Sequence, residues 1–191
     1  MGSGTLILLM AMSSSIVYVV MAYNRLVRLE QNVKTAWSNI DVLLKQRHDE
    51  LRGLVTTCRE YMQHEQETLE NVSLARTQVL NAIRSGDIVE LGVAESLMSN
   101  ALKRLFELTE NYPDLQSKES FLRLQTRIST LEDAIADRRE YYNNSVNINN
   151  IVVEEFPTNV VAGHFKFDRA DLFKVNEQEP NDVNLEAFFA A

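Results

Sequence analysis

An uncharged, mostly apolar run from Thr5 to Tyr23 is the feature that most constrains this chain. The first charged side chain is Arg25, and no Pro or Gly occurs between positions 5 and 52. At about 1.5 Å per helical residue the run extends about 28 Å, close to the roughly 30 Å hydrocarbon core of a bilayer. Because nothing interrupts the sequence after the run, we expect one helix to cross a membrane at 5–23 and to continue into the following domain.

A cleaved signal peptide is the alternative interpretation of the first 24 residues. It requires a basic start and a small-residue cleavage site. Residues 1–4 carry no Lys or Arg, and Val20 to Tyr23 is a poor cleavage context. The sequence therefore favours an uncleaved anchor with residues 1–4 as a short N-terminus.

The positive charges next to the run indicate its orientation. Arg25, Arg28 and Lys34 follow the apolar run closely, and no Lys or Arg precedes it. Since the side of a span that is richer in Lys and Arg stays in the cytoplasm, residues 24–191 are expected there, with the short N-terminus outside.

Composition narrows the function classes. The net charge is −8 and the basic residues are scattered among acids, whereas a nucleic-acid binder shows a basic stripe. The one cysteine, Cys58, cannot form an internal disulfide, which agrees with a reducing compartment. Its spacing from Leu51, Leu54 and Met62 predicts a thiol that faces the core, with a reactive thiol as the alternative.

Apolar side chains recur at intervals of three and four over most of residues 24–155, which predicts amphipathic helices. After Leu26 the first seam runs through Ala36, Ile40, Leu43, Arg47, Leu51, Leu54 and Cys58. A second helix ends at Ser85-Gly86-Asp87, and Asp87 with Glu90 is typical of a capping box. The third has the stripe Ala94, Leu97, Ala101, Leu105 and Leu108, and the fourth, from near Ser117, has Phe121, Leu124, Ile128, Leu131, Ile135, Arg138 and Tyr142.

The predicted fold class is therefore all-α, with the transmembrane helix continuous with an antiparallel four-helix bundle over 24–155. From Phe156-Pro157 onward the character changes. Residues 156–191 hold six of the eight Phe and two of the three Pro, so we expect an irregular apolar and acidic tail that packs as a loop or short strand. The alternative is a segment that binds a partner or another copy, and Phe165, Phe167 and Phe173 are its candidate contact residues.

Several motifs after the run appear in a fixed order. They read Ala36-Trp37-Ser38-x-Ile40-Asp41-Val42, Lys45-x-Arg47, Glu110-x-Tyr112-Pro113-Asp114-Leu115, Arg138-x-x-Tyr141-Tyr142-Asn143, Phe156-Pro157-x-Asn159 and Ala162-Gly163-x-Phe165-x-Phe167. This order resembles the signature of the LemA family over nearly everything after the anchor. The resemblance implies a single-span protein of the bacterial cytoplasmic (inner) membrane with an antiparallel helical bundle. Some relatives shape or organise specialised internal membranes.

The signature residues are the structural candidates: Trp37, Asp41, Arg47, Tyr112, Pro113, Arg138, Tyr142 and Asn143. Arg47 and Arg138 occupy seam positions on two helices, and a charge in a seam needs a partner, for which Asp41, Asp49 and Asp133 are candidates. A polar layer that fixes helix register explains this pattern, and a small-ligand or proton site in the bundle is the alternative.

No pattern in the sequence indicates catalysis or metal binding. A di-iron bundle needs Glu-x-x-His, but the residues three before His48 and His64 are Lys45 and Tyr61. There is no Gly-rich phosphate loop, no zinc spacing and no nucleophile beside a histidine. We therefore expect no enzyme, no cofactor, no metal, no nucleic acid and no small-molecule substrate.

Two hypotheses follow for function. The first is a membrane-anchored helical scaffold that self-associates and organises membrane or recruits partners, with Ala11 and Ser15 as small residues that let spans approach closely. The second is a signal-relay or binding module that couples the membrane to a specific protein partner not named by the sequence. The expected partners are thus the lipid bilayer, further copies of the chain, and an unknown protein.

Overall fold

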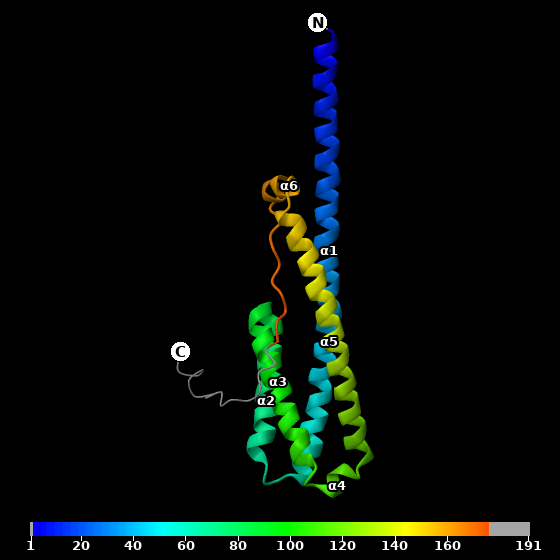
Figure 1. Cartoon of the computed structure of the whole chain (residues 1–191). Coiled ribbons are helices and arrows are strands. Elements are labelled where there is room, and N and C mark those ends of the chain that lie inside the picture. The colour runs from blue at the N-terminus through cyan, green and yellow to red at the C-terminus, as the bar shows by residue number, and fades with distance from the viewer. Residues whose placement is uncertain (1, 176–191) are drawn as a thin grey trace, which may run out of the picture. The chain divides into compact units, whose positions relative to one another are not determined.

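A computed structural model describes residues 2–175, and every regular element in that range is a helix. The elements are α1 (Gly2–Tyr61), α2 (Gln66–Ser85), α3 (Ile88–Thr109), α4 (Pro113–Gln116), α5 (Glu119–Glu154) and α6 (Thr158–Phe165) (Figure 1). The predicted all-α class is confirmed for these residues. Predictions about residues 176–191 lie outside the described part of the chain.

The apolar run forms the first third of α1, and its side chains are exposed. Leu8 and Met10 are 71% and 70% exposed, unlike the apolar residues of a protein core. Among the described helices, α1 alone is long and apolar enough to cross a membrane. Since a helix satisfies its own backbone hydrogen bonds, this segment is compatible with a single-pass membrane protein.

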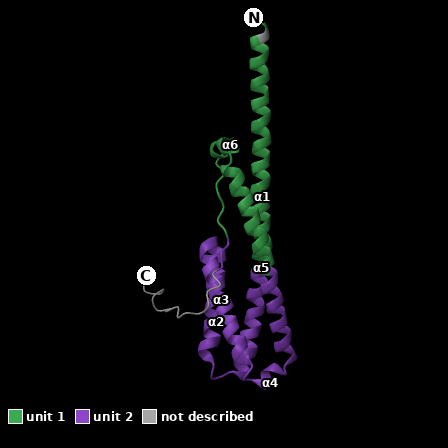
Figure 2. Cartoon of the chain, viewed as in Figure 1, with its two compact units in different colours: residues 1–42, 135–172 green, residues 43–134, 173–191 purple. Residues whose placement is uncertain are grey.

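The chain divides into two compact units, each described by itself (Figure 2). Unit 1 consists of residues 1–42 and 135–172, and unit 2 of residues 43–134 and 173–191. Helices α1 and α5 each contribute one part to each unit.

Unit 1 has a small core in which α6 packs on α1 and α5. Its buried members are Ala22 and Leu26 from α1, Val152 from α5, and Val161 and Ala162 from α6. The sequence predicted an irregular tail from residue 156, and this is wrong for residues 158–165, which form α6. The eight-residue segment contains Gly163 and two valines, so its intrinsic helix propensity is low and burial against α1 stabilises it.

After α6 the chain runs back along α5 without regular structure. The Asn150 side chain donates to the carbonyl oxygen of Ala170 and accepts from the Ala170 N–H, both at 2.9 Å. The Tyr142 hydroxyl donates to the carbonyl oxygen of Asp171, also at 2.9 Å. Two side chains of α5 therefore hold residues 170 and 171 in place.

In unit 2, α2 ends and Asp87 caps α3 as the sequence predicts, but the predicted capping box is incomplete. Gly86 ends α2 in the left-handed conformation, with φ of 74°, which costs Gly little because it has no Cβ. The Asp87 carboxylate then accepts from the backbone N–H groups of Val89 and Glu90 at 2.8 and 2.9 Å. The Glu90 carboxylate accepts from the Ser85 hydroxyl instead of completing a reciprocal capping box.

The predicted stripe on α3 is wrong in phase. The buried face runs through Leu91, Ala94, Met98, Leu102 and Leu105, whereas Leu97, Ala101 and Leu108 are half-buried. Ala94 and Leu105 belong to both stripes, so the apolar pattern alone does not distinguish them. The observed phase also turns the charged side chain of Glu95 inward.

The described end of the chain packs tightly on α3. Phe173 is 1% exposed within unit 2, and a Cβ on Gly92 would overlap the carbonyl oxygen of Lys174. The close approach of backbone to backbone is possible because position 92 lacks a side chain.

We therefore predict that Gly92→Ala lowers the free energy of unfolding by about 1–3 kcal/mol, because an added methyl group must push the backbone at residue 174 away. Gly163→Ala is the matched control, since nothing lies within 4 Å of its Cβ position. In that exposed helical position Ala should be neutral or stabilising by up to about 1 kcal/mol. Urea unfolding of the full chain in mild detergent measures both, and equal effects of the two substitutions would contradict the close contact.

Candidate functional site

A buried ion-pair cluster of three helices lies in unit 2. The Arg47 guanidinium on α1 donates to Glu95 Oε1 on α3 at 2.5 Å, and its Nη1 lies 3.6 Å from Glu132 Oε1 on α5. Arg47 and Glu95 are 2% and 4% exposed. The sequence predicted that Arg47 needs a partner in the seam, but its candidates were aspartates, and the structure assigns the two glutamates instead.

The cluster is incompletely hydrogen-bonded among residues 2–175. Arg47 Nε and Glu132 Oε1 are buried and have no hydrogen-bond partner there. Burial raises the pKa of the Glu132 carboxyl; the Arg47 charge opposes this, and the Glu95 charge adds to it. Two carboxylates thus share one guanidinium, which leaves the group with one excess negative charge when all three are ionised.

Two further titratable side chains lie on the same part of α1. Burial lowers the pKa of His48, and the charge of Arg76 on α2 acts in the same direction, which favours the neutral imidazole. Cys58 is fully buried, and burial raises the pKa of its thiol to about 12. A thiol held in its protonated form is a poor nucleophile, so this cysteine acts as a core residue.

Chemically, the cluster is suited to fixing the pairing of three helices. The charges align only in one register, since a shift of α1 by one residue would leave Glu95 buried without its cation. Arg47 and Glu95 are buried and Glu132 is half-buried. Among the described residues no three His, Cys, Asp or Glu side chains gather to hold a metal ion.

The other signature residues form two groups. The first group lies in unit 1. Trp37 is half-buried and meets the Tyr142 ring edge-on, with ring centroids 5.8 Å apart. Burial raises the pKa of the Tyr142 hydroxyl, which agrees with its role as a donor to the backbone of Asp171. Asp41 and Asn143 are half-buried in the same unit. Arg138 is exposed, so its predicted seam position is wrong.

The second group of signature residues consists of Tyr112 and Pro113, at the start of α4 in unit 2. Pro113 is the first residue of α4, where its missing N–H costs nothing. The Tyr112 hydroxyl donates to Glu65 Oε1 at 3.3 Å and so connects this turn to the segment before α2.

The structure places the remaining candidates as follows. Ala11 and Ser15 are exposed on α1, and the Ser15 hydroxyl donates to the Ala11 carbonyl oxygen of its own helix at 3.0 Å. The rings of Phe165 and Phe167 meet the Tyr23 ring edge-on, with centroid-to-centroid distances of 4.8 and 5.7 Å, respectively. The third aromatic candidate, Phe173, is buried in unit 2.

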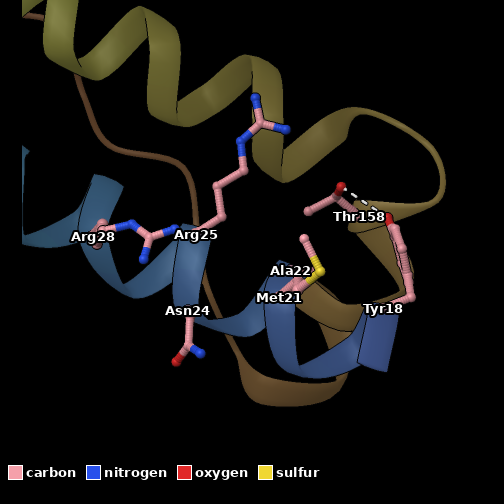
Figure 3. Close-up of a pocket in the computed structure, with 7 residues that line it drawn as sticks. All are labelled: Tyr18, Met21, Ala22, Asn24, Arg25, Arg28 and Thr158. Atoms are coloured by element: carbon pink, nitrogen blue, oxygen red, sulfur yellow. Dashed lines mark hydrogen bonds between the residues drawn. The ribbon is translucent and has the colours of Figure 1, made fainter. Parts of the chain in front are cut away.

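A cavity of about 340 Å³ lies in unit 1, where the apolar run gives way to charged sequence. In Figure 3, Tyr18 extends from α1 toward Thr158 at the start of α6, and Arg25 extends from α1 toward α5. The Tyr18 and Thr158 hydroxyl groups share a hydrogen bond of 3.3 Å. The remaining lining residues are Met21, Ala22, Asn24 and Arg28.

Comparison with known proteins identifies the family. The family model described as the LemA family matches residues 36–186, which is most of the chain. The chain belongs to the LemA family. Its similarity to Protein LemA of Metamycoplasma hominis is 29% identity over 162 residues, covering 84% of this chain and 73% of that protein.

Relatives named magnetosome proteins are also similar to this LemA-family chain. Magnetosome proteins MamQ 1 and MamQ 2 of Paramagnetospirillum magneticum are each 27% identical over 179 residues, covering 82% of this chain. The chain spans just under two thirds, 66%, of their length. Magnetosome protein MamQ of Magnetospirillum gryphiswaldense is 25% identical over 201 aligned positions, covering 91% of this chain and 74% of that protein.

Sequence reasoning missed Glu95 and Glu132. Glu95 sits four residues after Leu91 and three before Met98, so the correct stripe on α3 contains it as a polar member. A glutamate in that stripe together with Arg47 in the first seam is the signal that would have paired α1 with α3. The LemA-family motifs include Arg47 but, in the residues that carry the resemblance, neither glutamate.

We predict that Arg47→Met lowers the free energy of unfolding by about 3–5 kcal/mol at pH 7, because it leaves the buried Glu95 carboxylate and the half-buried Glu132 carboxylate without a cation. Arg138→Met is the matched control and should change it by less than about 0.5 kcal/mol, since Arg138 is exposed. Urea unfolding of the full chain in mild detergent compares the two.

The pH dependence gives a second test of the same substitution. With a folded-state pKa above the ordinary 4.5, ionised Glu132 costs stability above that raised pKa, and the cost is relieved as pH falls toward 4.5. Without the Arg47 cation, ionised Glu132 lowers the free energy of unfolding further at pH 7. The difference in the free energy of unfolding between Arg47→Met and wild type should therefore shrink as the pH falls. A difference that stays constant or grows as pH falls would contradict the account.

Proposed function

We propose that this LemA-family protein is a membrane-anchored helical scaffold that self-associates and organises membrane or recruits partners. In this proposal residues 5–23 cross the cytoplasmic membrane of a bacterium, residues 24–191 lie in the cytoplasm, and α1, α2, α3 and α5 form an antiparallel four-helix bundle. The protein performs no reaction of its own.

The observation that carries the proposal is the exposed apolar surface at the start of α1. Leu6, Leu8 and Met10 are each more than half exposed, and the side chains around the whole circumference of the helix are exposed too. A fully buried Leu, Ile or Met side chain is about 1.5–3 kcal/mol more favourable than an exposed one, so this surface requires an apolar environment. A lipid bilayer provides it.

The rest of the described chain supports a structural role. The Arg47–Glu95 ion pair is buried between helices, the Cys58 thiol is held protonated, and the cavity lies beside the apolar run. Relatives named magnetosome proteins agree with a role at a membrane.

Self-association is proposed through the span, where small side chains allow close helix contact. Ser15 follows Ala11 by one helical turn, and Ser13 lies on nearly the opposite face at 100° per residue. Both serine hydroxyls donate to a carbonyl of their own helix, so replacing either makes the same chemical change.

We predict that Ser15→Ile reduces the molar mass of the full chain in nanodiscs or mild detergent, measured by light scattering, because the larger side chain separates the spans. Ser13→Ile should leave the oligomer unchanged. A single copy in the wild type, or equal masses for the two variants, would contradict assembly through the Ala11–Ser15 face.

A monomer would instead direct attention to the second function, a relay or binding module. Crosslinking in cells separates the two functions, since a scaffold recovers further copies of itself and a relay recovers one specific protein. The continuity of α1 from the apolar run to Tyr61 is the observation that favours this alternative.

A further inference from the structure

The cavity beside the apolar run has the features of a binding site for an amphiphile. Its lining on α1 follows one helix face, with Tyr18, Met21 and Ala22 first and Arg25 and Arg28 after them. The residues around the cavity therefore change from apolar to basic along α1 within about 15 Å, at 1.5 Å per residue. A phospholipid changes from acyl chain to charged headgroup over a similar distance and in the same direction.

The positive charges of Arg25 and Arg28 are available to bind an anion. Neither guanidinium has an ion-pair or hydrogen-bond partner among residues 2–175, and both side chains are exposed. Two acidic side chains of unit 1 already have basic partners: Glu30 pairs with Lys34 at 2.8 Å, and Glu154 pairs with Arg169 at 2.7 Å. A planar guanidinium presents paired N–H donors that match the oxygens of a phosphate group.

Aromatic and apolar side chains of unit 1 lie at the same height along α1 as the cavity. The Tyr18 hydroxyl bonds Thr158 at the start of α6, and the Tyr23 ring meets Phe165 at its end. Phe156 and Val160 are 78% and 65% exposed beside these contacts, which is typical of a segment that lies in the interfacial region of a membrane. Helix α6 thus reaches the level along α1 at which lipid headgroups are expected.

We propose that the cavity between α1 and α6 holds part of an acyl chain of an anionic phospholipid against Tyr18, Met21 and Ala22, and that the exposed guanidinium groups of Arg25 and Arg28 at its rim bind the phosphate headgroup. This inference rests on the proposed insertion of residues 5–23 into a bilayer. Basic pockets at the cytoplasmic boundary of a membrane protein favour anionic lipids, and each arginine near the surface contributes about 1 kcal/mol.

Native mass spectrometry of the full chain, released from detergent micelles with added lipid, tests the proposal. Phosphatidylglycerol should bind at least about tenfold more tightly to the wild type than to Arg25→Gln/Arg28→Gln, since two arginines contribute about 1 kcal/mol each. The matched control is Arg52→Gln/Arg59→Gln, which removes the same charge from exposed positions on the same helix and should retain wild-type affinity. The variant Arg25→Lys/Arg28→Lys keeps the charge and should retain most of the binding.

Three results would overturn the proposal. One is equal binding of phosphatidylglycerol and the zwitterionic phosphatidylcholine to the wild type. Another is undiminished phosphatidylglycerol binding to Arg25→Gln/Arg28→Gln, with circular dichroism showing that this variant is folded. The third is displacement of bound phosphatidylglycerol by millimolar inorganic phosphate, which would assign the site to a free anion.

A second experiment distinguishes failure of the membrane anchor from failure of the lipid site. The same wild-type protein, reconstituted in vesicles and washed with alkaline carbonate, should remain with the lipid. Release by carbonate would overturn both the anchor and the lipid site, whereas retention together with one of the three results above overturns the lipid site alone.

Discussion

The uninterrupted backbone hydrogen bonding of α1 is the constraint on which the rest of the structure depends. A helix is the form in which an apolar segment enters lipid without unsatisfied N–H and C=O groups, and neither Pro nor Gly occurs between residues 5 and 52 to interrupt it. The same helix then supplies Ala22 and Leu26 to the core of unit 1 and Arg47 to the cluster of unit 2. One element thus carries lipid-facing, core-forming and charge-pairing residues in order along its length.

The polar groups of the two units are paired in different ways. In unit 2 the buried Arg47 is paired with Glu95 and Glu132 across three helices, which favours one register over others without adding much net stability. In unit 1 the residues after α6 lack regular structure, and the side chains of Asn150 and Tyr142 satisfy part of their backbone. Sequence-distant polar contacts therefore define the fold where periodic apolar packing does not.

Features encoded by neighbouring residues could be predicted from the sequence. The apolar run, the left-handed Gly86 and the cap at Asp87 depend only on local chemistry, and the structure has all three. The face of α3 could not be predicted, because two apolar stripes share Ala94 and Leu105. The choice between them depends on Arg47, which makes burial of Glu95 possible from 48 positions earlier in the chain.

Helix α6 and the candidate lipid site were beyond prediction for the same reason. Residues 158–165 have weak helix propensity, and their helix forms against Ala22 and Leu26, more than 130 residues away in sequence. Arg25 and Arg28 could be recognised as orientation signals, but their place in a cavity follows only once α6 packs on α1. The Phe-rich composition indicated that this region is not a free linker, and the contacts of Tyr23 with Phe165 and Phe167 give the physical reason.

Cysteine accessibility along α1 tests the membrane insertion of this helix most directly. Single cysteines at Met10, Val17, Gln31 and Thr35 would all be exposed in the protein itself, so only a bilayer distinguishes them, and the native Cys58 is buried and unreactive. In vesicles containing the full chain, a membrane-impermeant maleimide applied to both faces should label Gln31→Cys and Thr35→Cys but leave Met10→Cys and Val17→Cys unlabelled. Equal labelling at all four positions would show that α1 does not enter the bilayer.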